Sequence, residues 1–162
     1  MLVGILSDSH GHPIPVQQAM ALFDARGVEH IIHCGDIGGL EVFDELVGRR
    51  CTMVWGNTDV PGGGVLGYLQ AAGLSAPQIG PARVTLEGKT IAVFHGHERG
   101  FDTAVANLGV DYIFHGHTHE CRDDRVGKTR IINAGALHRA RRKTVAMLDT
   151  ATDELTFHEI RP

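Results

Sequence analysis

The chain has 162 residues, which matches a single domain over residues 1–162, and a domain of this size buries roughly two-thirds of its unfolded surface. Hydrophobic residues make up 43% and charged residues 21%, as in ordinary globular proteins, and the net charge of −4 supplies no positive field for a long nucleic acid. No stretch approaches the ~20 apolar residues that span a bilayer, so we expect no membrane integration.

The three cysteines, Cys34, Cys51 and Cys121, are widely separated and odd in number. This spacing argues against a disulfide framework and against a thiolate zinc site. It favours a reducing compartment, so we expect the protein in the cytoplasm.

The first part of the chain is predicted to alternate between strands and helices. In chain order we expect a strand at 2–6, a helix at 13–26, a strand at 30–34, a helix at 40–47 and a strand at 52–55. Apolar strands separated by helices favour parallel pairing, with the helices on the faces of the sheet. Ligands gather at the carboxyl ends of such strands, so the residues that follow them are of special interest.

The rest of the chain begins with a segment rich in Gly, Ala and Pro at 61–81, which we predict to be mobile, with a short helix near 65–71 and a place in one wall of the site. After it we expect strands at 83–87 and 90–94 joined as a hairpin by Gly88-Lys89, a helix at 101–108 and a strand at 111–114. A later antiparallel set is predicted around 126 and at 130–133, 144–149 and 154–160, forming a second sheet.

Seven side chains that can bind a metal follow the ends of predicted strands. They are Asp8, His10, Asp36, Asn57, His95, His117 and His119. Seven carboxylate, amide and imidazole ligands are enough to bind two cations, if one carboxylate bridges the cations and each cation also has neutral ligands. Two such cations share a water, lower its pKa and bind phosphoryl oxygens. The whole set therefore predicts a two-metal site for hydrolysis of phosphate esters.

Each fragment alone has an ordinary structural explanation. Asp8 could cap the helix that follows, Asp36 is typical of a plain turn, and a lone histidine such as His95 is usually structural. Two His-Gly-His fragments, at 95–97 and 115–117, are harder to explain in this way, because both stand at predicted strand ends where imidazoles can bind transition metals. Asp36 is expected to bridge the two metals.

With these motifs in this order, the chain resembles the calcineurin-like metallophosphoesterases, in particular the small bacterial and archaeal phosphodiesterases of the YfcE type. The resemblance implies an α/β (α+β) fold of four layers, an αββα sandwich of two mixed sheets with helices outside. It implies that one metal is bound by Asp8, His10, Asp36 and His119. It implies that the other metal is bound by Asp36, Asn57, His95 and His117.

The chain departs from the family pattern where many relatives carry a histidine that assists the leaving group, because Thr58 stands at that place. His97, His12 and His138 are alternative proton donors, although each is also typical of a solvated loop histidine. We assign the catalytic roles to Asp36, Asn57 and His97.

A second departure lies at residues 133–139, where alanines replace the Pro and Ser of the family's Asn-Pro-Gly-Ser turn. Gly135 is retained, so we expect the turn to survive. The basic residues that follow, Arg139, Arg141, Arg142 and Lys143, could contact a substrate phosphate, but a run of charge is more often a solvated face.

The most consistent function is hydrolysis of a small phosphodiester, with a phosphomonoesterase as the nearest alternative. A binding scaffold of the same fold, like the retromer scaffold subunit, is a third reading. A mixed oxygen and nitrogen ligand set suits two divalent ions of Mn, Fe, Co, Ni or Zn, and the resemblance favours Mn²⁺. Few aromatic residues, 6% of the chain, argue for a nucleotide-sized substrate over a long single strand, and a homo-oligomer is compatible with the sequence.

Overall fold

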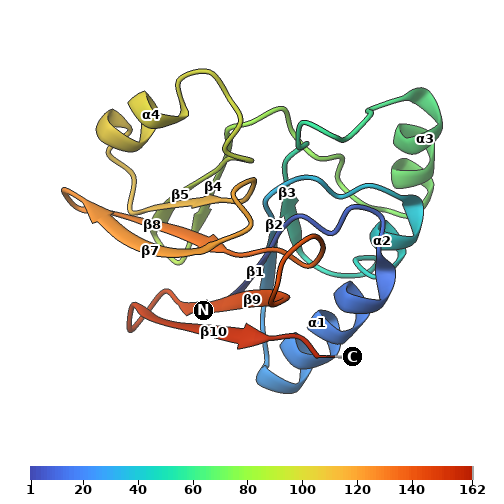
Figure 1. The fold of residues 1–162 in the computed structure, drawn as a ribbon, viewed down its shortest axis with the longest axis horizontal. Helices are drawn as coiled ribbons and strands as arrows, with labels where there is room; N and C mark the ends of the chain where they lie inside the picture. The colour runs from blue at the N-terminus through green and yellow to red at the C-terminus, as the bar shows by residue number, and fades with distance from the viewer. Residues whose placement is uncertain (162) are drawn as a thin grey trace.

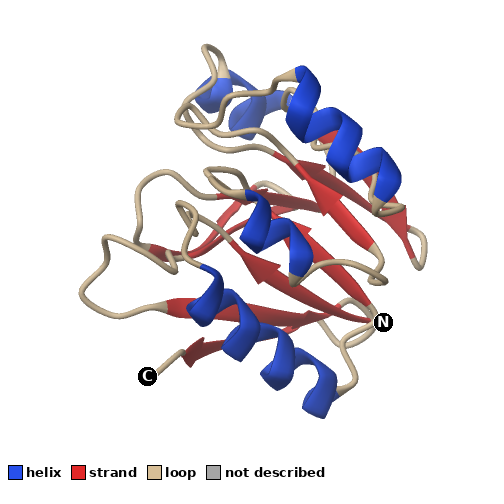
Figure 2. Cartoon of the chain, turned by 90° about the vertical axis from the view of Figure 1, so that its right-hand side faces the viewer, coloured by secondary structure: helices blue, strands red, loops and turns tan. Residues whose placement is uncertain are grey.

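The computed structural model describes residues 1–161 and packs two five-stranded sheets face to face, with helices outside (Figures 1 and 2). The strands are β1 (Leu2–Leu6), β2 (His30–His33), β3 (Cys51–Met53), β4 (Ala82–Leu86), β5 (Lys89–Val93), β6 (Tyr112–His115), β7 (Cys121–Val126), β8 (Thr129–Ala134), β9 (Thr144–Asp149) and β10 (Glu154–Glu159). The helices are α1 (Pro13–Arg26), α2 (Leu40–Asp44), α3 (Gly63–Ala71) and α4 (Phe101–Asn107). None of the helices within residues 1–161 combines the length and apolar character required to cross a membrane.

Both sheets are mixed. The first sheet has the order β10-β9-β1-β2-β3, in which β1, β2 and β3 run parallel and β9 and β10 antiparallel. The second sheet has the order β4-β5-β6-β8-β7, in which β5, β6 and β8 run parallel. Parallel neighbours bring their carboxyl ends to the same edge of a sheet, so the loops that follow them are neighbours in space.

Three hydrophobic cores separate the four layers. The first lies between the first sheet and α1, α2 and α3, and it includes Leu6 and Phe23. The second lies between the two sheets and includes Val3 and Phe114. The third lies between the second sheet and α4 and includes Ile113. The predicted αββα sandwich of two mixed sheets is therefore confirmed, with α4 alone covering the outer face of the second sheet (Figure 1).

Strand β1 shows how sequence alternation creates these layers. Successive side chains of a strand point to opposite faces. Val3 and Ile5 enter the core between the sheets, whereas Leu6 enters the core beneath the helices. Gly4 also faces the helices, and a Cβ there would collide with the ring of Phe23. The glycine therefore lets α1 approach the first sheet closely.

The structure corrects the predicted second sheet. Strands β9 and β10 join the first sheet, and β8 pairs in parallel with β6, so the later strands do not form one antiparallel set. Strand β7 extends over Cys121–Val126, where the sequence indicated strand character only near its end. Because β7 is an exposed edge strand, most of its residues are charged, and its sequence does not show the alternation of apolar and polar residues that would indicate a strand with a buried face.

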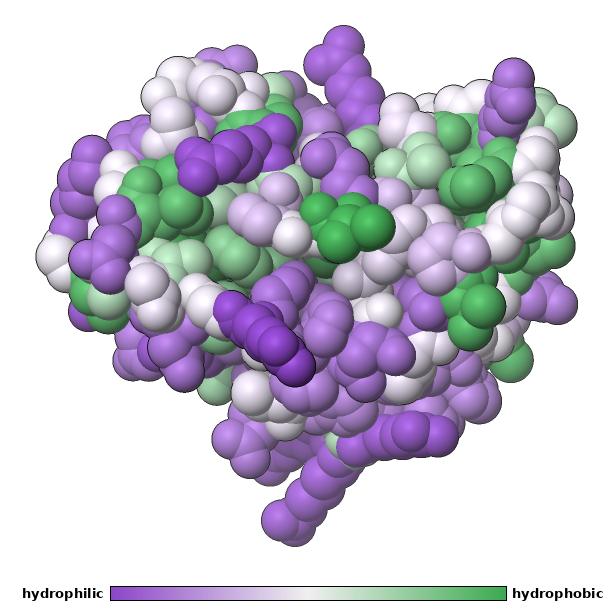
Figure 3. Space-filling model, turned by 90° about the horizontal axis from the view of Figure 1, so that it is seen from above, coloured by the Kyte–Doolittle hydropathy of each residue, from purple (hydrophilic) through white to green (hydrophobic). Residues whose placement is uncertain are grey.

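Two helices also differ from expectation. Helix α2 ends at Asp44, because the next residues form tighter turns, such as the hydrogen bond from Leu46 N–H to the Phe43 carbonyl (2.9 Å). In the segment 61–81 the structure places α3, and Gln78 forms an isolated parallel bridge with Val54. Seen from above, apolar side chains gather over the α3 and α4 sides, with mainly polar side chains between them (Figure 3).

Candidate metal centre

Loops from both sheets carry the seven predicted ligands. These loops follow β1, β2, β3, β5 and β6. Backbone hydrogen bonds join neighbouring loops, from Asp8 N–H to the Gly35 carbonyl (3.0 Å) and from Gly116 N–H to the His95 carbonyl (2.9 Å). The backbone N–H of His117 donates to Asp8 Oδ2 (3.1 Å), which ties the second sheet to the first. Fragments far apart in the sequence thus form one cluster.

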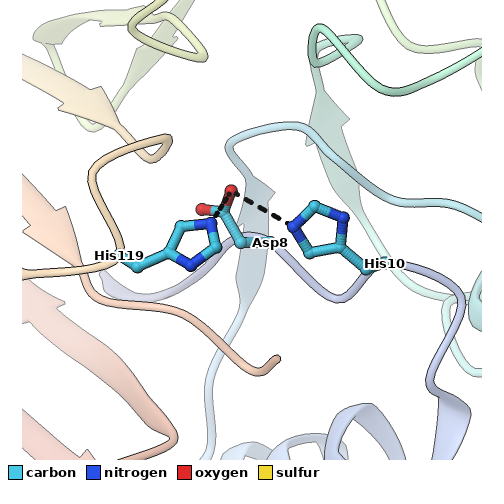
Figure 4. Close-up of side chains that lie close together, drawn as sticks. All are labelled: Asp8, His10 and His119. Atoms are coloured by element: carbon cyan, nitrogen blue, oxygen red, sulfur yellow. Dashed lines mark ion pairs between the residues drawn. The ribbon is translucent and has the colours of Figure 1, made fainter. Parts of the chain in front are cut away.

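Asp8, His10 and His119 form the first ligand group. Their potential ligand atoms all lie within 4.8 Å of one another. Asp8 Oδ1 is 3.1 Å from His119 Nε2 and 3.9 Å from His10 Nε2. Figure 4 shows the two imidazoles on opposite sides of the carboxylate, each with a ring nitrogen turned toward it. The loop after β1 in the first sheet and the loop after β6 in the second sheet therefore supply one compact set of potential metal ligands.

Asp36, Asn57 and His95 form the second ligand group. His95 Nε2 lies 3.5 Å from Asp36 Oδ2 and 3.0 Å from Asn57 Oδ1. The ring of His117 is beside this group, with its centroid 5.1 Å from that of His95. Asn57 and His117 are exposed, whereas Asp36 and His95 are buried, so the group has an inner and an outer side.

The geometry divides the ligands differently from the two sets implied by the family resemblance. The compact trios share Asp8, since the second trio consists of Asp8, Asp36 and His95. Asp36 Oδ2 nevertheless lies within reach of both ligand groups, at 3.7 Å from His10 Nε2 and 3.5 Å from His95 Nε2. The bridging role of Asp36 stays a prediction, since Asp8 is the carboxylate that the two trios share.

The second ligand group brings three acceptor atoms together. His95 Nδ1–H donates to the carbonyl of Cys34 (2.8 Å), so a neutral imidazole turns the lone pair of Nε2 toward Asn57 Oδ1 and Asp36 Oδ2. Three acceptors repel one another unless a cation or a proton lies between them. Burial lowers the pKa of His95, but the carboxylate of Asp36 and the Cys34 carbonyl outweigh burial and raise the pKa above its usual value. A proton on Nε2 can therefore take the place of a metal.

In the first ligand group, no proton takes the place of a metal in this way. Asp8 Oδ1 and His10 Nε2 are buried and have no hydrogen-bond partner among the described residues. Burial lowers the pKa of His10, Asp36 and Asp8 oppose this, and the nearby Arg139 adds to the lowering. The imidazole is consequently neutral near pH 7, with a lone pair for a cation. Because unpaired buried polar atoms are costly, this arrangement fits a bound divalent metal.

The carboxylate of Asp36 is held in its charged form. Burial alone raises its pKa, but hydrogen bonds accepted from the protonated ring of His95 and from the backbone N–H of Thr58 (2.9 Å) hold the pKa well below its ordinary range. Asp36 therefore presents a full negative charge at all physiological pH values. Thr58, which replaces the family's histidine, thus contributes its backbone N–H to the centre.

Five of the predicted ligands adopt a left-handed backbone conformation. They are Asp8, His10, Asp36, His117 and His119, with φ between 46° and 67°. Residues other than glycine rarely occupy this region, and each instance costs of order 1 kcal/mol. In β1 alternation would turn neighbouring side chains to opposite faces, whereas these turns let Asp8 and His10 approach the same point. The strain is concentrated where side chains converge.

Motif glycines make this convergence sterically feasible. A Cβ at Gly56 would collide with the Asp36 carboxylate, and one at Gly116 would collide with the side chains of Ser7 and Asp8. A Cβ at Gly35 would come within 2.7 Å of His95 Nδ1. The missing side chain of Gly35 therefore leaves room for the His95 ring.

The three alternative proton donors lie on two sides of the cluster. The ring centroid of His97 is 5.3 Å from that of His95, and its side chain is 37% exposed. His12 and His138 stack on each other with centroids 3.8 Å apart, and the His138 ring is 5.8 Å from that of His10. All three are near ligands, so position alone does not select His97, and its catalytic role stays a prediction.

Three polar residues hold the loops in place, a role that sequence reasoning assigned to none of them. Asp59 accepts hydrogen bonds from the backbone N–H groups of residues 37, 38 and 56. Glu98 accepts from those of residues 95 and 96, and Asn133 donates to the Gly116 carbonyl (2.9 Å). The available signal was a carboxylate or amide two or three residues from a motif glycine, a position suited to bonding local backbone N–H groups.

Comparison with known proteins agrees with this geometry. The family model for the calcineurin-like phosphoesterase superfamily domain matches residues 1–153. The chain is 28% identical to phosphodiesterase MJ0936 of Methanocaldococcus jannaschii over 95% of this chain and 96% of that protein. A solved structure described as a novel archaeal phosphodiesterase superposes with a TM-score of 0.88 at 26% identity, covering 98% of this chain and 99% of that one.

The same fold also occurs in a protein of another kind. Vps29 from Entamoeba histolytica, solved with zinc, superposes with a TM-score of 0.72 at 22% identity, covering 98% of this chain and 91% of that one. At this identity the likeness concerns the fold alone. The match of the family model over nearly the whole chain is decisive for the family, and the chain belongs to the calcineurin-like phosphoesterase superfamily.

Proposed function

We propose that the protein is a phosphodiesterase that hydrolyses small phosphodiesters with two divalent cations, Mn²⁺ being the first choice. The phosphodiesterase relative supports the reaction class. The mixed carboxylate, amide and imidazole donor set is suited to Mn, Fe, Co, Ni or Zn. The net charge of −4 and the low aromatic content favour a nucleotide-sized substrate over a long nucleic acid.

The observation that carries this proposal is the pair of unpartnered atoms in the first ligand group. Asp8 Oδ1 and His10 Nε2 face each other across 3.9 Å without a hydrogen-bond partner among the described residues. A purely structural cluster would satisfy these atoms, since burial without a partner costs about 1–3 kcal/mol for each. A divalent ion satisfies both at once.

The protein's own residues orient the reaction. In the bound state, the two cations would lower the pKa of a water and neutralise charge on the phosphoryl oxygens. Asp8 and Asp36 hold the negative charge that attracts them, and the neutral Asn57 keeps the total charge of the donor set low. We assign to His97 the donation of a ring-nitrogen proton to the departing oxygen, because its exposed ring adjoins the second ligand group.

The test is hydrolysis of bis(p-nitrophenyl) phosphate by the purified protein with and without Mn²⁺, together with elemental analysis of bound metal. We expect Mn²⁺-dependent release of p-nitrophenolate and about two metal ions per chain. His117→Ala should abolish most turnover. His158→Ala is the matched control, since His158 is on β10 and outside the ligand groups.

Two alternative functions give distinct outcomes in the same assay. A phosphomonoesterase would hydrolyse p-nitrophenyl phosphate faster than the diester. A binding scaffold would take up metal but hydrolyse neither substrate, and that result would overturn the proposal. Activity unaffected by chelation would contradict the metal requirement.

A further inference from the structure

A hollow of about 730 Å³ adjoins the first ligand group. Its lining residues include His119, Arg139, Arg141, Arg142, Phe157 and two carboxylates, Glu120 and Glu159. His119 belongs to both places, because its Nε2 faces Asp8 Oδ1 at 3.1 Å while the residue also lines the hollow. A substrate held at the metal centre can therefore extend past His119 into the hollow.

The loop that brings arginines to this hollow is fixed at both ends. It connects β8 to β9, and an isolated bridge joins Ala136 to Lys143 across it. His119 Nδ1–H donates to the carbonyl of Arg139 (3.3 Å), so the loop is bonded directly to a predicted metal ligand. Ile160 N–H donates to the carbonyl of Lys143 (2.8 Å), which ties the loop to the end of the chain. These contacts hold the loop in place as one wall of the hollow.

The charges on this wall are unbalanced. Arg139, Arg141 and Arg142 form no ion pair with a carboxylate anywhere in residues 1–161. Two carboxylates also line the hollow, of which Glu159 is paired with Arg161 (3.2 Å). Three unpaired guanidinium groups therefore meet a single unpaired carboxylate, in a protein whose net charge is −4. Such a local excess of positive charge suits an anionic ligand.

The hollow also has an apolar lining residue. Phe157 of β10, the edge strand of the first sheet, lines the hollow and is 39% exposed. A planar ring of a ligand can pack against it, since an exposed aromatic face stacks with any base.

We propose that this hollow binds a second anionic group on one substituent of the phosphodiester, so that the preferred substrates are nucleotide diesters carrying an additional phosphate. The proposal rests on the proposed function, because it assigns specificity to the same centre. Arginine is suited to this role, since its guanidinium binds phosphate oxygens in a bidentate manner. Arg139, Arg141 and Arg142 are then specificity-determining residues.

The test compares two substrates with the same leaving group. They are the 5′-(p-nitrophenyl phosphate) of thymidine and the same ester with a 3′-phosphate added. With Mn²⁺, we expect the 3′-phosphorylated ester to show a kcat/KM about 10-fold to 100-fold higher, mainly through a lower KM. In the Arg141→Ala/Arg142→Ala variant this ratio should fall toward one, and in Arg141→Glu/Arg142→Glu it should fall below one.

A double variant at the opposite edge of the molecule controls for the loss of net charge. Arg26 lies at the end of α1 that is remote from the His10 loop, and Arg50 precedes β3 at its amino end, whereas the ligand loop follows its carboxyl end. Arg26→Ala/Arg50→Ala should therefore keep the substrate ratio of the unaltered protein. Circular dichroism and metal content check that each variant folds. An equal kcat/KM for both esters, or an equal change of both in the arginine variants, would overturn the anion subsite and leave the phosphodiesterase in place. Absence of turnover of either ester would instead count against the proposed function.

Discussion

The two ligand groups use similar side chains but satisfy their polar atoms differently. In the second group, His95 Nδ1–H donates to Cys34, and a proton on Nε2 can bond Asn57 Oδ1. In the first group, Asp8 Oδ1 and His10 Nε2 have no such partner among the described residues. The second group is therefore organised without a metal, whereas the first carries an energetic cost that a cation removes. The difference suggests that metal binding stabilises chiefly the first group.

The largest effect is expected where the two groups meet. Asp36→Ala removes the carboxylate oxygen that lies within 4 Å of both His10 and His95, so we expect kcat with Mn²⁺ to fall by roughly a thousandfold or more. Asp124→Ala is the matched control, because Asp124 is exposed on β7 and pairs only with Arg122. Retention of more than about a tenth of the activity would show that Asp36 does not serve both groups.

Addition of metal should stabilise the protein through the first group. At Mn²⁺ concentrations about 100 times Kd, we expect the free energy of unfolding to rise by about 2.7 kcal/mol and Tm by about 5–10 °C. Differential scanning calorimetry with and without Mn²⁺ measures the shift. His10→Ala should lose most of it, and a variant that keeps the full shift would remove His10 from the ligands.

Loss of one histidine from each group separates them in the metal-free protein. His95→Ala removes the hydrogen bonds to Cys34 and Asn57, and we expect a loss of about 2–3 kcal/mol in the free energy of unfolding. His10→Ala removes a ring nitrogen that has no hydrogen-bond partner within residues 1–161, so the loss should be about half as large or less. Urea denaturation in the presence of a chelator gives both values. Equal losses would contradict the difference between the groups.

The last effect is a pH dependence of the free energy of unfolding in the metal-free protein. It arises from His33, which belongs to neither ligand group. His33 of β2 is buried, and burial lowers its pKa from 6.5 to about 3, with Nε2 bonded to Ser9 Oγ (2.9 Å). Between these two pH values the unfolded chain binds a proton that the folded chain does not, so stability falls as pH falls below 6.5. The shifted pKa of His33 alone should lower the free energy of unfolding by about 2 kcal/mol between pH 7 and pH 5.

The variant His33→Gln should show a flatter dependence of unfolding free energy on pH. His115 acts in the same direction, because burial lowers its pKa to about 4, and its slope remains in the variant. The raised pKa of His95 acts in the opposite direction, since its contribution is present at low pH and is lost as pH rises. An identical pH slope in the variant and the unaltered protein would show that His33 is not held neutral.

The elements near the site were largely predictable because local patterns specify them. The strands before Asp8, Asp36 and His95 are short apolar runs that end at glycine or a polar residue, and the structure places strands there. The hairpin is confirmed, but its two-residue turn is Glu87-Gly88, one residue earlier than the predicted Gly88-Lys89, because Lys89 pairs with Leu86. These features depend on residues that are close in sequence.

The sheet order could not be predicted in the same way. The pairing of Leu2 with Asp149 joins the two ends of the chain, and no local pattern distinguishes it from pairing with another late strand. Sequence reasoning gave no supporting role to Asp59 or Glu98, because carboxylates are common in loops and the backbone N–H groups that they bond are brought within reach only by the folded loops. The seven predicted ligands could be identified as a set from the sequence, but their division into groups depends on tertiary geometry.

The position of β1 has a consequence for the order in which the protein matures. Val3 pairs with Leu148, so the strand that leads to Asp8 gains one of its two neighbours only when residues far apart in the sequence come together. The other neighbour, β2, and the hydrogen bond from Asp8 N–H to the Gly35 carbonyl involve residues much closer in sequence. Because contacts between distant residues form more slowly than local ones, we expect the Asp8 loop to gain its full support late in folding, when β9 docks beside β1.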